Sequence, residues 1–134
     1  RGNWAVGIGG HINPEDDRRD AVTSKDELRK RQEAAYWEAF YREIKEETGY
    51  MLRASPKTEA PIVALIYDES NEVGLVHFGI VHIFKVPTGT EFLTNDPSIS
   101  GGAWFDQDSL VSTTMSSDSI NFENWSKLVL RNVL

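Results

Sequence analysis

The chain has 134 residues, 40% of them hydrophobic and 10% aromatic, which is enough for one globular domain with a real core and too few for two. It contains no cysteine, so disulfides, thiolate metal sites and a cysteine nucleophile are excluded. A net charge of −7 argues against general binding to nucleic acid or to an anionic membrane. No apolar run is long enough to cross a bilayer. We therefore expect a single domain over residues 1–134, in the cytoplasm.

The first segment, residues 3–9, has the pattern of a short strand that runs into a glycine turn. Gly9 and Gly10 form that turn, and paired glycines let the backbone approach a ligand or a metal closely. Two acids, Glu15 and Asp16, follow soon after. On their own these features indicate only a turn.

A long helix is predicted from about Lys25 to Thr48. Ser24 and Glu27 form a capping-box pattern at its start. Apolar residues then recur with a period of roughly 3.6 residues. Gly49 stands just past the end, where a left-handed cap is expected. The helix should bury aromatic residues in its middle and present acids at its end.

Three of those acids, Glu43, Glu46 and Glu47, fall within one narrow arc of the helix. They repel one another and lie at the negative end of the helix dipole, so a bound cation would stabilise them. Carboxylate oxygens suit Mg²⁺ or Mn²⁺. Arg42 lies beside them, where it could hold a carboxylate through a charge-assisted hydrogen bond. Each Glu taken alone would be read as a solvated acid.

Residues 42–50 read Arg-Glu-Ile-Lys-Glu-Glu-Thr-Gly-Tyr. This string resembles the second half of the signature of the Nudix hydrolases: Arg, Glu, an aliphatic residue, any residue, Glu, Glu, any residue, Gly and a hydrophobic residue. Every fixed position matches. The resemblance implies that Glu46 and Glu47 are the main metal ligands and that Glu43 is a ligand or a base. It also implies that Arg42 orients a carboxylate, so the catalytic candidates are Glu43, Arg42 and Glu46.

The same resemblance gives a role to the glycine turn. A Gly-Gly pair opens the family signature, and a carbonyl from Gly10 or Gly9 can be a metal ligand. The family then has a Glu six residues after the second glycine. Counting from Gly10 gives Asp16, and counting from Gly9 gives Glu15. Both assignments stay open, with Asp16 as the candidate metal ligand.

The spacing departs from the family inside the signature. The usual pattern places the Arg eight residues after that Glu, whereas Asp16 and Arg42 are 26 apart (42 − 16), which leaves about 18 additional residues (26 − 8). We place this insert at approximately residues 17–34. Charge-rich segments usually face water, so a solvated loop and a helix extension are expected. In the alternative, arginines of the insert contact the phosphates of a substrate: Arg18, Arg19 or Arg29 to Arg31.

The middle of the chain predicts an antiparallel pair of strands. Residues 51–57 are expected to form a strand that ends at a proline, and residues 61–67 a buried strand. Residues 73–86 form a longer apolar run, which is expected to pair with it. His77 and His82 would face opposite sides of a regular strand, so we expect structural hydrogen bonds and no shared metal.

Residues 91–102 read as a loop, followed by a short strand at 103–105, a helix, and a C-terminal amphipathic helix that contains residues 122–129. Members of the Nudix family often carry an additional Glu in the loop before a Trp at the position of Trp104. Glu91 and Asp96 are the only acids in that loop. The sequence does not choose between them.

Together these elements predict an α+β domain with a mixed β-sheet flanked by helices. The resemblance implies the Nudix α/β/α sandwich, and a start at Arg1 fits one that lacks part of its N-terminal strand. It also implies a hydrolase that uses Mg²⁺ (or Mn²⁺) to cleave a phosphoanhydride bond in a nucleoside diphosphate-linked or related small molecule. The alternative is a Nudix-like module that binds a nucleotide or a protein without hydrolysis. A homodimer is compatible with the sequence.

Overall fold

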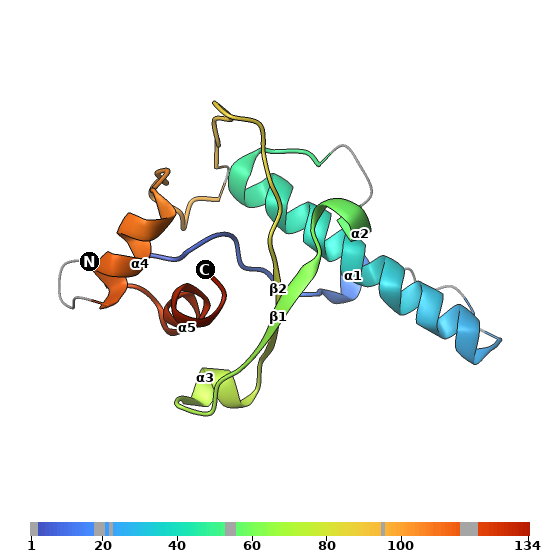
Figure 1. Cartoon of the computed structure of the whole chain (residues 1–134). Coiled ribbons are helices and arrows are strands. Elements are labelled where there is room, and N and C mark those ends of the chain that lie inside the picture. The colour runs from blue at the N-terminus through green and yellow to red at the C-terminus, as the bar shows by residue number, and fades with distance from the viewer. Residues whose placement is uncertain (1–2, 18–20, 22, 53–55, 95, 116–120) are drawn as a thin grey trace. The chain divides into compact units, whose positions relative to one another are not determined.

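The structure is a computed structural model that describes residues 3–17, 21, 23–52, 56–94, 96–115 and 121–134 (Figure 1). The chain divides into two compact units. One unit is formed by Arg1–Gly7, Lys57–Thr88 and Ala103–Leu134, and the other by Ile8–Pro56 and Gly89–Gly102. The expectation of one domain over residues 1–134 stays a prediction.

The second unit is built on the long helix α1, Lys25–Thr48, which has the predicted bounds (Figure 1). Its start is the predicted capping box, in which Ser24 accepts a hydrogen bond from the Glu27 N–H and the Glu27 carboxylate accepts one from Ser24. Its end is Gly49, which adopts the left-handed conformation (φ 68°) and donates its N–H to the Lys45 carbonyl. Sequence and structure therefore agree on both ends of this helix.

The first turns of α1 are solvent-exposed. Burial begins at Ala35 and continues at Ala39, Ile44 and Thr48, which share one side of the helix. Residues 25–34 are thus a mostly exposed stretch of helix in front of the packed part of α1. That these residues belong to an insert stays a prediction.

The chain before and after α1 packs against that helix within the same unit. The short 3₁₀ helix η1, Pro14–Asp16, precedes it. From the loop that follows Thr88, Leu93 donates its N–H to the Thr48 carbonyl at 2.9 Å. The Tyr50 and Phe92 rings meet edge to face, with centroids 6.2 Å apart.

The strand predicted at 51–57 is wrong for the described residues. Met51 and Leu52 are in no strand, and residues 53–55 lie outside the described part. A short helix, α2 (Pro56–Glu59), stands where the strand was expected to end. The reason lies in Pro56, because proline is favoured at the first position of a helix as well as at the end of a strand.

In the first unit, β1 (Ile62–Tyr67) and β2 (Phe78–His82) form the predicted antiparallel pair. β2 is shorter than the apolar run 73–86, because the Asn71 side chain accepts a hydrogen bond from the Gly74 N–H and caps the helix α3, Glu72–Leu75. The expectation that β1 is buried is wrong, since Ile66 is its one buried residue.

Two other expected strands are absent from the described residues. In place of a strand at 3–9, Trp4 forms a single parallel bridge with Phe122. Residues 103–105 lead directly into α4, Gln107–Met115. The C-terminal helix is α5, Asn124–Asn132, and its Trp125 packs so closely on β2 that a Cβ at Gly79 would lie 2.8 Å from the indole ring.

The predicted α+β class is therefore confirmed, with a sheet that is antiparallel over its two described strands. Both histidines have the structural role expected of them. The Nδ1 atom of His77 lies 2.6 Å from the Val73 carbonyl oxygen, and that of His82 lies 2.5 Å from the Ala60 carbonyl oxygen. Among the described residues, no helix combines the length and the apolar character that a membrane crossing requires.

The glycine cap of α1 gives a prediction about stability. A Cβ at Gly49 would meet the Leu93 carbonyl oxygen at 2.9 Å, in addition to the cost of a positive φ. Gly89 also has a positive φ (83°), but nothing lies within 4 Å of a Cβ built there. We expect Gly89→Ala to lower the free energy of unfolding by about 1–2 kcal/mol, the usual cost of a left-handed residue, and Gly49→Ala to lower it by more. Equal losses in urea unfolding would show that Leu93 does not restrict this position.

Candidate functional site

The centre of the site is Arg42, on the last turns of α1. Its Nε and Nη2 atoms donate to the two carboxylate oxygens of Asp16, each at 3.0 Å. Its Nη1 atom donates to Glu43 at 2.9 Å and to Glu46 at 3.2 Å. Nη2 also donates to the His11 carbonyl at 3.0 Å. One guanidinium thus joins the turn before the helix to two of the three predicted acids.

Asp16 is buried, with 8% of its surface exposed, and the Arg42 hydrogen bond lowers the pKa of its carboxyl below the ordinary value. The Asn13 N–H also donates to it, at 2.7 Å. Of the two acids that the sequence left open, Asp16 is thus the one that meets Arg42, while Glu15 is exposed. Both carboxylate oxygens of Asp16 accept hydrogen bonds from Arg42, so these contacts favour Asp16 as the residue that orients Arg42. The role of Asp16 as a metal ligand stays a prediction.

The glycine turn lies against the helix acids. The His11 N–H donates to Glu43 Oε1 at 3.2 Å, and the Gly9 N–H donates to the Glu47 carboxylate. Gly10 has no space for a side chain, because a Cβ there would overlap the Glu43 side chain. The predicted approach of this turn to the acids is therefore present. The contacts use N–H groups, and the role of the Gly10 carbonyl as a metal ligand stays a prediction.

Glu47 has the most strongly perturbed carboxyl of the site. Its pKa is raised from 4.5 to about 7, mainly by burial and also by the negative charges of Glu43 and Asp96, while the Gly9 N–H opposes the rise. The Glu47 carboxyl is therefore partly buried and is repelled by two neighbouring carboxylates. A cation placed among them would relieve this repulsion.

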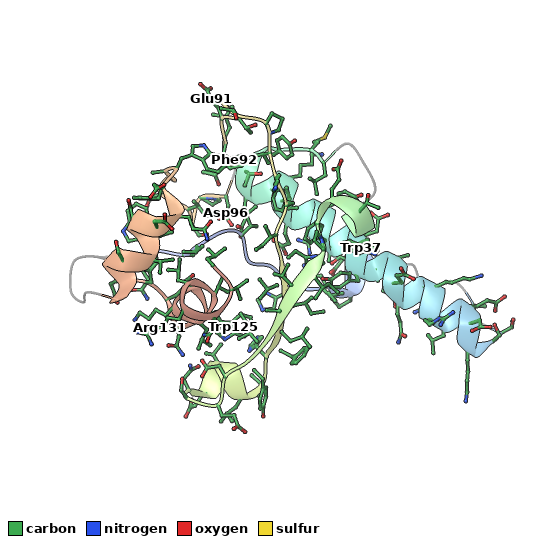
Figure 2. The ribbon with its side chains drawn as sticks, viewed as in Figure 1. Trp37, Glu91, Phe92, Asp96, Trp125 and Arg131 are labelled. Atoms are coloured by element: carbon green, nitrogen blue, oxygen red, sulfur yellow. The ribbon has the colours of Figure 1, made fainter. Side chains whose placement is uncertain are left out.

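Asp96 is one of the two loop acids between which the sequence did not choose, and it is the one whose charge reaches Glu47. Its charge acts on Glu47, and its own carboxylate accepts the Ser98 N–H at 2.7 Å in a tight turn. The other acid of the loop, Glu91, is labelled at the tip of the loop in Figure 2, away from Asp96. The Asp-Pro-Ser pattern, in which the Asp side chain bonds to the backbone two residues on, was the one local signal that could have indicated a fixed position for Asp96.

The donor chemistry of this site fits a hard divalent cation. Its oxygens come from four carboxylates: Glu43, Glu46, Glu47 and Asp96. Among the described residues, no three acidic or histidine side chains are gathered tightly enough to enclose one ion. The negative charges of Glu43 and Asp96 act on Glu47, so a cation bound here would be stabilised by several carboxylates.

The arginines proposed for substrate binding divide into two groups. Arg18 and Arg19 lie outside the described residues. Arg29 is 77% exposed and lies 3.8 Å from Asp26, whereas Arg31 is paired with Asp17 at 2.5 Å.

A family model, described as the NUDIX domain, matches residues 1–126. The chain therefore belongs to the Nudix family, whose members in general hydrolyse nucleoside diphosphate-linked substrates. Comparison with curated proteins and with solved structures found no match. The matched range includes Arg42, Glu43, Glu46 and Glu47, whose individual roles stay predictions.

The raised pKa of Glu47 predicts a dependence of stability on pH. The unfolded chain loses this proton near pH 4.5, and the folded chain keeps it up to about pH 7. The unfolded state therefore binds fewer protons in this window, so the free energy of unfolding contributed by Glu47 falls as the pH rises from about 4.5 to about 7 and is constant above it.

We expect Glu47→Gln to remove this fall, which can be measured from urea unfolding curves of the metal-free protein at several pH values. Glu38→Gln, which removes an exposed acid of the same helix, controls for net charge. If Glu47→Gln and the wild-type protein kept the same slope with pH, Glu47 would not be the titrating group.

Proposed function

We propose that this protein is a metal-dependent hydrolase that cleaves a phosphoanhydride bond in a nucleoside diphosphate-linked or related small molecule. The observation that carries this proposal is the geometry at the end of α1, where Arg42 fixes Glu43 and Glu46 and joins them to Asp16. Glu47 lies next to them, where burial and the charges of Glu43 and Asp96 raise its pKa. Such a site binds a divalent cation more tightly as its last proton leaves. Membership of the Nudix family supports the same reaction class.

Mg²⁺, or Mn²⁺ in its place, would be held mainly by Glu46 and Glu47, with Glu43 as a further ligand or as the base. When bound, such an ion neutralises charge on a diphosphate and lowers the pKa of water. Arg42 keeps one oxygen of Glu43 and one of Glu46 in fixed positions, which leaves their other oxygens for the ion or for water.

Asp96 supplies a carboxylate from outside α1. Because it is held by Ser98 and not by Arg42, it is available to orient or deprotonate an attacking water molecule. We propose it as the loop acid of this chain, in preference to Glu91. Arg18 and Arg19 remain the proposed contacts to substrate phosphates, supported by their charge and by their place in the insert.

The wider setting is also a proposal. A net charge of −7 supports a small-molecule substrate and argues against general nucleic-acid or membrane binding. The absence of cysteine supports a cytoplasmic location. We propose that residues 1–134 form one catalytic domain. A homodimer is compatible with this proposal.

The reaction can be tested on a panel of nucleoside triphosphates, dinucleoside polyphosphates and ADP-ribose, with Mg²⁺ and with Mn²⁺. We expect turnover of at least one compound, and a loss of about 100-fold or more in kcat for Glu46→Gln and for Glu47→Gln, because each removes charge that the transition state requires. Circular dichroism should show an intact fold in both variants. Binding of a compound without product release would favour the alternative, a non-catalytic binding module.

The loop acid can be tested by a matched pair of variants. Asp96→Asn should lower kcat by about 10-fold or more, since a positioned base contributes at least that much, while Glu91→Gln should leave the wild-type rate. Both changes remove one negative charge from the same loop. The assignment of Asp96 is contradicted if the two variants have the same rate.

A further inference from the structure

A second ion pair stands beside the Asp16–Arg42 pair. Arg31 donates from Nε to Asp17 Oδ1 at 2.6 Å and from Nη2 to Asp17 Oδ2 at 2.5 Å. The contact is two-pronged, which fixes orientation as well as distance. The side chains of Arg31 and Asp17 are only 26% and 36% exposed, so this pair is better ordered than an ordinary surface pair.

The two arginines lie on one side of α1. They are 11 residues apart (42 − 31), which is about three turns, a rotation of about 20° and a rise of about 16.5 Å. Their partners Asp16 and Asp17 are consecutive, with Cα atoms about 3.8 Å apart. The long side chains of Arg31 and Arg42 must therefore reach toward each other along the helix.

This geometry holds η1 from both directions. A shift of η1 toward the start of α1 would stretch the Asp16–Arg42 pair, and a shift toward its end would stretch the Asp17–Arg31 pair. The glycine turn, which precedes η1 by a few residues, contacts Glu43 and Glu47 through the His11 and Gly9 N–H groups. A shift of η1 along α1 would therefore move the His11 and Gly9 N–H groups relative to the carboxylates of Glu43 and Glu47.

The need for such a restraint follows from the insert. The connection enters α1 at Lys25, 17 residues before Arg42 (42 − 25), which is a rise of about 25 Å along the helix, so the connection does not by itself hold the turn close to Arg42. Arg31 belongs to the first turns of α1, which we assign to the insert. Its ion pair with Asp17 fastens the chain directly after η1 to the helix.

We propose that Asp17 and Arg31 are a positioning pair, which sets the register of the glycine turn on α1 and so prepares Glu43, Glu46 and Glu47 for a divalent cation. The part of this proposal that concerns the cation rests on the proposed function. The pair does not touch the ion or the substrate. Its effect passes through Asp16 and Arg42.

The proposal is tested with Arg31→Ala, with Arg29→Ala as the matched control, since Arg29 is an exposed arginine on the same extension. The first measurement is Mn²⁺ uptake, followed by electron paramagnetic resonance of the free ion. We expect affinity about 3- to 10-fold weaker for Arg31→Ala and unchanged for Arg29→Ala. The loss is smaller than the roughly 10- to 100-fold typical for a group bonded directly to a metal ligand, because Arg31 acts through Asp17, Asp16 and Arg42. Asp17→Asn should match Arg31→Ala, and the double variant should be no weaker than either.

The second measurement uses the metal-free protein. The Nε–H of Arg42 should exchange slowly with solvent in nitrogen-15 spectra of the wild-type protein and of Arg29→Ala, and faster in Arg31→Ala. Circular dichroism establishes that α1 is intact. If Arg31→Ala matched Arg29→Ala in both measurements, the positioning role would be wrong.

The two measurements also separate this proposal from the proposed function. If the wild-type protein takes up no Mn²⁺, the metal-dependent function fails, and Arg42 exchange alone decides whether the pair sets the register. Faster exchange in Arg31→Ala would then support the register, and equal exchange would overturn it.

Discussion

The site depends on one guanidinium. Arg42 contacts Asp16, Glu43, Glu46 and the His11 carbonyl, so it joins segments that are up to 31 residues apart in the chain. No backbone ladder connects these segments, and the described strands belong to the other unit. Removal of Arg42 would leave the buried Asp16 without its main partner, and Glu43 and Glu46 without the positive charge that contacts them. Removing one partner of a buried ion pair is destabilising, because it leaves the other charge uncompensated.

Charge is distributed unevenly around this guanidinium. Arg42 compensates Asp16, Glu43 and Glu46, whereas the charge that acts on Glu47 comes from Glu43 and Asp96 and is repulsive. The protein thus neutralises one side of the acidic helix end and leaves the other side in excess. This excess charge costs stability, because Glu47 is buried next to like charges. It is consistent with the proposed metal site.

The parts of the fold that were predictable depend on local chemistry. Both ends of α1 were predicted because Ser24, Glu27 and Gly49 act on residues within one turn. The strand at 51–57 was mispredicted because proline begins a helix as readily as it ends a strand. The strand predicted from the apolar run at 73–86 is shorter in the structure, because Asn71 caps a short helix at its start. Within the site, the family signature indicated Arg42 and the three glutamates. The sequence named Asp96 together with Glu91, and the choice between them depends on a contact with Glu47, which is distant in sequence. The Asp17–Arg31 pair also joins distant positions, and one sequence holds no signal for it.

The central claim is that the end of α1, with Glu43, Glu46 and Glu47 held beside Arg42, takes up a divalent cation. Crystals soaked in millimolar Mn²⁺ and measured at the manganese absorption edge test this most directly. We expect an anomalous peak among these carboxylates, with the Arg42–Asp16 pair retained. The account would be contradicted by density that shows these side chains without an anomalous peak, or by a peak that lies only elsewhere on the protein.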